Sequence, residues 1–91
     1  MNDTNLLIGS LSNDLLRLAT FIHNGSPSAR RFLTESVRWA TPLTCADLPP
    51  HIKLIAKEIS SLPSALPTTA QAERYLMYSV LLQNYALHST P

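Results

Sequence analysis

Charge, glycine and cysteine are all scarce in this sequence, and each shortage excludes a class of protein. Charged residues make up 14% of the 91 residues, against about a quarter in ordinary globular domains. Two glycines are too few for a glycine-rich phosphate loop. The single cysteine, Cys45, cannot form an internal disulfide, which is typical of a reducing compartment. No run approaches the ~20 apolar residues of a membrane span, so we expect a soluble cytoplasmic protein that does not bind membranes.

The charges that are present also argue against a nucleic-acid partner. The formal net charge is +1, and the two signs are interspersed, so no strong field would steer the chain toward nucleic acid or an anionic membrane. Apolar residues make up 45% of the sequence, which is an ordinary globular value and predicts a folded core. The length predicts one domain over residues 1–91.

Seven prolines and a set of capping residues divide the chain into segments with helical periodicity. We expect helices over about residues 3–24, 26–40, 50–61 and 69–88. Gly25 closes the first helix, because glycine adopts the left-handed conformation of a helix end. Ser26, followed by proline, opens the second, and Pro42 ends it. Thr68 and Gln71 form a capping box before the fourth.

These helices predict an all-α protein, either a small four-helix bundle or an irregular helical array. Strand signals are absent, since nowhere does an apolar–polar alternation persist. The start of the first helix is open, because Gly9 is a poor helix residue. A shorter helix capped by Ser10 or Ser12 would leave residues 1–9 as a tail.

The last predicted helix has no charged side chain between Tyr75 and Pro91. A surface helix normally carries a charged face, so this one should be covered on more than one side. Its aliphatic flank, formed by Leu76, Val80 and Leu87, is expected to pack on the other three helices. Its tyrosine flank is then expected to form a two-fold homodimer contact, because tyrosine is favoured at interfaces; this predicted interface consists of Tyr75, Tyr78, Leu82 and Tyr85. The alternative is that the last helix is central and wrapped by the other three.

The residues that could carry chemistry are dispersed along the chain. Three histidines and Cys45 fall on four different segments without the spacing of a metal site, and no nucleophile has a catalytic motif around it. We therefore expect no metal, no cofactor and no enzymatic activity. Asp14 lies at the edge of the first helix's apolar arc. It is either a functional acid, a first-turn acid, or paired with Arg17 or a basic residue of the second helix.

A second possible partner surface is formed by residues that face away from the predicted core. Arg31 and Arg38 lie on the polar side of the second helix, and Leu54 lies opposite the isoleucines of the third. Together these features predict a small interaction or regulatory protein that acts as a homodimer. The alternative function is a bundle that binds a small apolar or aromatic ligand between the second and fourth helices, lined by Tyr75, Tyr78 and Trp39.

Overall fold

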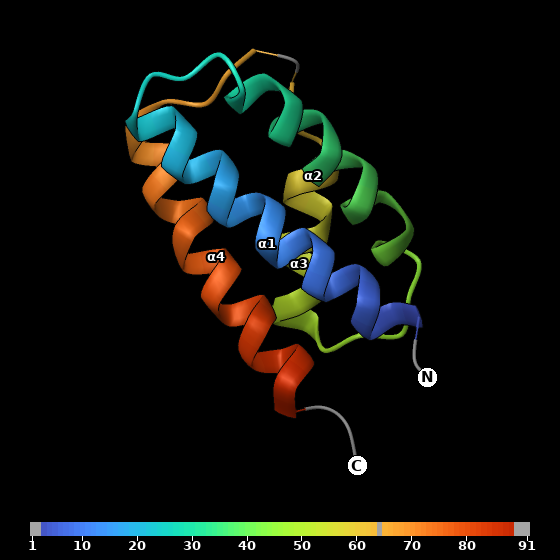
Figure 1. Cartoon of the computed structure of the whole chain (residues 1–91). Helices are drawn as coiled ribbons and strands as arrows, with labels where there is room; N and C mark the ends of the chain where they lie inside the picture. The colour runs from blue at the N-terminus through green and yellow to red at the C-terminus, as the bar shows by residue number, and fades with distance from the viewer. Residues whose placement is uncertain (1–2, 64, 89–91) are drawn as a thin grey trace.

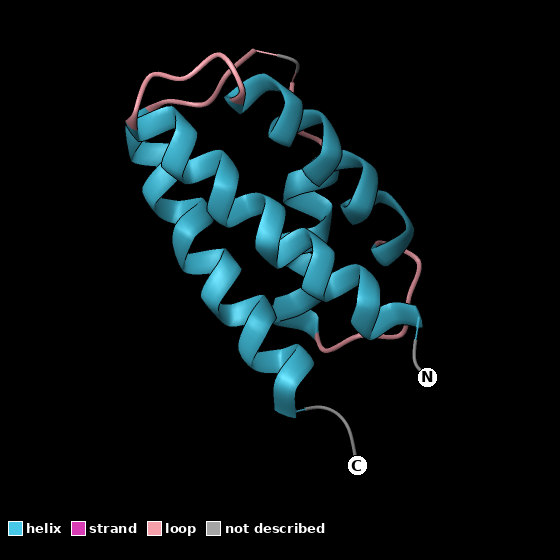
Figure 2. Cartoon of the chain, viewed as in Figure 1, coloured by secondary structure: helices cyan, strands magenta, loops and turns pink. Residues whose placement is uncertain are grey.

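The computed structural model of the protein describes residues 3–63 and 65–88, which form four helices and no strand. The helices are α1 (Asp3–His23), α2 (Ala29–Leu43), α3 (Pro50–Ser60) and α4 (Thr69–His88). They run alternately up and down in a bundle of 40 × 20 × 20 Å (Figure 1), and loops join them (Figure 2). The predicted all-α class is confirmed, and the fold is a four-helix bundle.

The four sides of the bundle are closed to different degrees. α1 packs along α2 and along α4, and α2 packs along α3, whereas α3 approaches α4 over only a short stretch. In Figure 1 α1 lies in front and α3 lies behind it. α1 and α3 are therefore at opposite corners of the bundle, and the side between α3 and α4 is the least closed.

The core is built on one stripe of α1. Its side chains at Ile8, Leu11, Leu15 and Leu18 have no exposed surface, as their helical spacing predicts. Burying each such side chain contributes about 1.5–3 kcal/mol, so this stripe is a main source of stability. The other helices complete the core with Ala29, Leu33, Ala40, Leu43, Ile52, Ile55, Ala56, Ile59, Tyr75, Tyr78 and Leu82.

The turn after α1 is closed by the glycine that the sequence predicts. Gly25 has a φ of 65°, and its N–H donates to the Ile22 carbonyl at 3.1 Å. The Ser26 N–H donates to the Phe21 carbonyl at 2.9 Å. This pair of bonds is the Schellman motif, which satisfies the last carbonyls of a helix. α1 is helical from Asp3 onward, so the alternative of a tail is excluded for residues 3–9.

The capping box of α4 is also present. The Thr68 N–H donates to Gln71 Oε1 at 2.8 Å, and the Gln71 N–H donates to Thr68 Oγ1 at 3.2 Å. The predicted bounds of α4 match the structure, and α3 ends one residue before the predicted position. The end of α1 and the start of α4 were predictable because the hydrogen bonds that fix them join residues close together in the sequence.

The bounds of α2 differ from the prediction of 26–40. The helix begins at Ala29, after a turn in which the Ser28 N–H donates to Ser26 Oγ at 3.2 Å. It continues through Pro42 to Leu43, so the predicted stop at proline is wrong. The last turn has 3₁₀-type hydrogen bonds, in which the N–H groups of residues 44 and 45 donate to the carbonyls three residues earlier. Full burial of Leu43 offsets the restriction that proline imposes.

The two glycines provide a matched test of the turn after α1. A Cβ added at either position would meet no atom within 4 Å, so only the backbone conformation distinguishes them. Gly25→Ala should lower the free energy of unfolding by about 1 kcal/mol, because alanine resists a positive φ. Gly9→Ala should raise it by about 0.5–1 kcal/mol, because alanine favours the helix. Urea unfolding followed by circular dichroism measures both, and equal shifts in one direction would contradict the assignment.

Candidate functional site

The tyrosine flank of α4 faces the interior of its own chain, which corrects the predicted homodimer interface. Tyr75 is 1% exposed, Tyr78 is 9% exposed and Leu82 is fully buried. Tyr85 is partly buried and packs against the same core. Both flanks are apolar, so the wheel alone could not decide which one faces inward. The tyrosine flank is buried because the Tyr78 hydroxyl reaches polar partners at the edge of the bundle and the rings of the flank pack in or against the core.

The Tyr78 hydroxyl and its two partners, Arg74 and Glu58, form a polar triangle that spans the side between α3 and α4. Arg74 Nε donates to the Tyr78 hydroxyl at 2.6 Å, and that hydroxyl donates to Glu58 Oε1 at 2.9 Å. Arg74 Nη2 also donates to Glu58 Oε1 at 2.8 Å. Burial raises the pKa of Tyr78, and the hydrogen bond to Tyr78 followed by the charge of Glu58 raises the pKa of Arg74. The triangle therefore holds a neutral phenol between a cation and a carboxylate.

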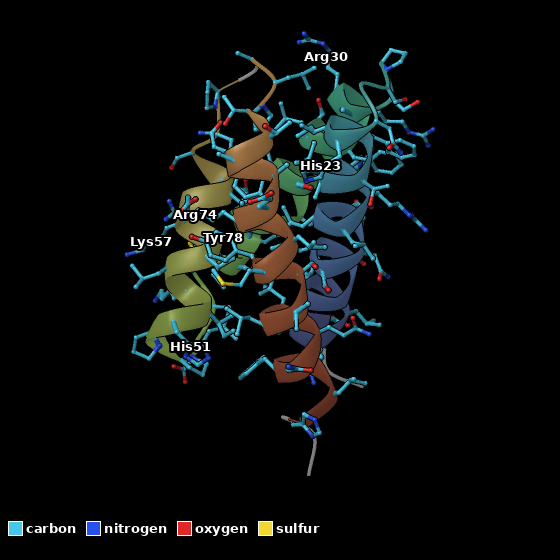
Figure 3. The ribbon with its side chains drawn as sticks, turned by 90° about the vertical axis from the view of Figure 1, so that its left-hand side faces the viewer. His23, Arg30, His51, Lys57, Arg74 and Tyr78 are labelled. Atoms are coloured by element: carbon cyan, nitrogen blue, oxygen red, sulfur yellow. The ribbon has the colours of Figure 1, made fainter. Side chains whose placement is uncertain are left out.

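A groove of about 840 Å³ lies along this side of the bundle. We call it the α3–α4 groove. Figure 3 shows Arg74 and Tyr78 on α4 beside α3, with Lys57 on the outer side of α3 and His51 near its start. The apolar residues that line the groove are Leu54, Ile55, Leu62, Tyr75 and Leu81, and the polar ones are His51, Lys57, Glu58, Ser61, Gln71, Arg74 and Tyr78.

The aliphatic residues of α4 are on the surface, contrary to the prediction that they pack on the other helices. Nine large apolar side chains are exposed in the described part of the chain, and five of them are on α4. We call these five residues the outer face; their exposed fractions range from 40% to 64%, and they are Leu76, Met77, Val80, Leu81 and Leu87. The last helix is therefore neither central nor wrapped.

The orientation of α4 is fixed on its other side by a contact with α1. Ser12 Oγ donates to the Ser79 carbonyl at 2.6 Å, and both serines are buried. This bond places the Ser79 side of α4 against α1. Leu16, one turn after Ser12, is 44% exposed beside this contact.

The second predicted partner surface is not one surface. The guanidinium of Arg31 lies 5.8 Å from the Phe32 ring centre, and that of Arg38 lies 5.8 Å from the Trp39 ring centre. Phe32 stacks on a ring of α1 at 5.3 Å, so these arginines lie on the α1–α2 side. Leu54 is 67% exposed on α3, where it lines the α3–α4 groove. The structure confirms the exposure of all three residues and separates the arginines from Leu54.

Asp14 joins α1 to α2. The Trp39 indole N–H donates to Asp14 Oδ2 at 2.7 Å, and Arg17 Nη1 lies 3.7 Å from Asp14 Oδ1. Of the alternatives that the sequence left open, pairing with Arg17 is present, and the α2 partner is an indole rather than a basic residue. Trp39 is thereby directed toward α1. Tyr75 and Tyr78 line the α3–α4 groove, whose lining does not include Trp39, so the three residues of the predicted ligand site do not line this groove together.

The dispersed histidines and cysteine remain dispersed in the fold. Within residues 3–63 and 65–88, no group of three histidine, cysteine, aspartate or glutamate side chains is placed to hold a metal ion. Cys45 is exposed as a free thiol. None of the described helices combines the length and apolar content needed to cross a membrane.

Comparisons with family models, with curated proteins and with solved structures gave no match. The outer face and the α3–α4 groove therefore have only their geometry and chemistry to indicate a function. Sequence reasoning identified Leu76, Val80 and Leu87 as one apolar flank but placed that flank against the core, so it did not predict the outer face. It also missed the polar triangle, because Glu58 and Arg74 are 16 residues apart and no local pattern links them.

Ser12 tests the contact that orients α4, and Ser36 provides a comparison at a second buried serine. Ser12→Ala should lower the free energy of unfolding by about 1 kcal/mol, because it removes the bond to the Ser79 carbonyl. Ser36 is fully buried, and its hydroxyl has no hydrogen-bond partner among the described residues. Ser36→Ala should therefore raise the free energy of unfolding by about 1 kcal/mol. Chemical denaturation of both variants gives the comparison, and a stabilised Ser12→Ala variant would contradict the proposed role of the bond.

The raised pKa of Tyr78 predicts a pH dependence of stability. The unfolded phenol ionises near its ordinary value of 10.0, whereas the folded phenol stays protonated to higher pH. The free energy of unfolding should therefore be fully retained below pH 10 and fall as pH rises above it. Tyr78→Phe should make this fall less steep, while Tyr75, whose pKa burial also raises, keeps part of it. Parallel profiles for wild type and variant between about pH 9 and 11 would contradict this account.

Proposed function

We propose that this chain is a small non-enzymatic interaction or regulatory module that acts as a homodimer through the outer face of α4. The observation that carries the proposal is that five large apolar side chains are exposed on one helix that has no charged residue from Tyr75 to His88. Extended apolar patches are rare on monomers and mark association surfaces. The single, exposed and unpaired Cys45 suits a reducing compartment such as the cytoplasm.

The spacing on this face supports a helix-to-helix contact. Met77, Val80, Asn84 and Leu87 alternate at three and four residues, which is the repeat of a two-helix seam. All four are exposed, and Leu76 and Leu81 flank them. A homodimer with two-fold symmetry uses the same patch on both copies, so this seam would pair with itself.

Electrostatics favour an antiparallel pairing of the two α4 helices. In a parallel pair, Glu73 would face its own copy across the seam, and like charges that face each other are destabilising. In an antiparallel pair, Met77 faces Leu87 of the second copy and Val80 faces its Asn84, while Glu73 lies beyond the seam. The helix dipoles also run in opposite directions in this arrangement.

Two glutamate substitutions test the proposal with a matched control. Val80→Glu places a charge in the seam and should convert the dimer to a monomer in sedimentation equilibrium. Leu54→Glu introduces the same charge at an exposed leucine of α3, which is 67% exposed against 53% for Val80, and it should leave the dimer intact. Burying an unpaired carboxylate is strongly unfavourable, which is the reason for the difference. A wild-type chain that sediments as a monomer at high micromolar concentration would overturn the proposal.

A substitution at Asn84, which lies in the same seam, should strengthen the dimer rather than weaken it. A polar residue in an apolar seam fixes the register at a cost in stability. Asn84→Leu should therefore tighten the dimer and also populate larger assemblies, both of which sedimentation velocity resolves. An Asn84→Leu variant that dissociates more readily than wild type would place the contact elsewhere.

A further inference from the structure

The α3–α4 groove is a second surface, separate from the outer face, and its length would accommodate a helix. Along the other three sides of the bundle neighbouring helices pack on each other, whereas α3 and α4 approach over a short stretch only. The groove follows α3 from His51 to Glu58, continues along Ser61 and Leu62 just after the helix, and follows α4 from Gln71 to Leu81. Ten residues of helix measure about 15 Å, so about three turns of a helix fit along it.

The bottom of the groove is apolar and its rim carries exposed apolar side chains. Ile55 is 4% exposed and Tyr75 is 1% exposed, and both line the groove. At the rim Leu54 is 67% exposed on α3 and Leu81 is 41% exposed on α4. An occupant that touches both walls would therefore remove apolar surface from water on each side.

The charges along the groove specify the sign of the occupant. Among the described residues that line the groove, Glu58 is the only one with a carboxylate side chain. Arg74 and Tyr78 already bond to that carboxylate. Lys57 lines the same groove. Lys53 does not line it, but it lines a second hollow that shares Leu54 and Lys57 with the groove. Neither lysine forms an ion pair within the described residues. The rim therefore presents positive charge that lacks a carboxylate partner.

We propose that the α3–α4 groove binds an amphipathic helix of a second protein, with apolar residues facing Ile55 and Leu81 and carboxylates facing Lys53 and Lys57. Helices bind in grooves of this kind through apolar anchors at positions i, i+3 or i+4, and i+7. The open, elongated shape suits a helix better than a small ligand, which a site normally encloses over most of its surface. This site does not depend on the dimer, because its lining residues share only Leu81 with the outer face.

A designed peptide tests the proposal directly. The probe is a fluorescent, helix-forming peptide with leucines at i, i+4 and i+7 and glutamates on both flanks, and the control peptide has lysines in place of the glutamates. Fluorescence anisotropy should show at least a tenfold preference for the glutamate peptide. That preference should shrink as salt is added, because Lys57 is exposed and salt screens the charge of an exposed side chain. Equal binding of the two peptides would overturn the proposal.

Two variants locate the peptide on the protein. Lys57→Glu and Leu54→Glu change exposed side chains, so circular dichroism should show an unchanged fold. Each should weaken binding of the glutamate peptide by about tenfold or more, the loss that follows from reversing a charge or burying one (about 1.4 kcal/mol or more). Val80→Glu, which lies on the outer face, should bind the peptide as wild type does. Lys57→Glu binding with unchanged affinity would overturn the proposal.

Two further outcomes would assign the groove to another occupant. If the glutamate peptide fails to bind but the dye anilinonaphthalene sulfonate binds in a manner that Lys57→Glu abolishes, the groove is a small-molecule site. If Leu54→Glu or Lys57→Glu dissociates the homodimer, the groove is filled by a second copy of the chain. Either result overturns the proposed partner helix. The first leaves the dimer proposal standing, and the second moves its contact from the outer face to the groove.

Discussion

The burial of Tyr75 and Tyr78 against the chain's own core is the packing interaction on which the surfaces of this bundle depend. It fixes the rotation of α4 about its axis, and that rotation turns Val80 and its aliphatic neighbours outward. The rotation is held from both sides, by the Ser12 bond to the Ser79 carbonyl and by the bonds of the Tyr78 hydroxyl. A buried hydroxyl needs partners, so the tyrosine flank can face inward only where such partners exist.

The polar triangle explains why one side of the bundle stays open. Arg74 and Glu58 are long side chains, and together with the Tyr78 hydroxyl they connect α3 to α4 without close apolar packing along the two helices. The other three sides are closed by leucine, isoleucine and alanine contacts. Two exposed surfaces with apolar side chains on α4 therefore differ in chemistry within the described part of the chain. The outer face of α4 is uncharged and suits a copy of itself, whereas the α3–α4 groove has a positive rim and suits an acidic partner.

The ends of the helices show how far local signals reach. Gly25 and the Thr68–Gln71 pair act through bonds to residues three to five positions away, so the sequence predicted both ends. Pro42 was a misleading signal, because the burial of Leu43 outweighed the local preference against a helix before proline. The candidate surfaces were harder to predict. Their residues were visible as an uncharged last helix and an exposed Leu54, but the inward flank of α4 was assigned the wrong way round.

The sequence by itself determined the class of fold, because helical periodicity and capping residues specify helices through local contacts. It also showed that α4 is apolar on two flanks, because the stretch from Tyr75 onward contains no charged residue. Only the tertiary structure decided which flank faces the core, which helices are neighbours and where Glu58 meets Arg74. Those outcomes depend on contacts between residues far apart in the chain, such as Ser12 with Ser79, and on which hydroxyl groups find partners once the helices are packed.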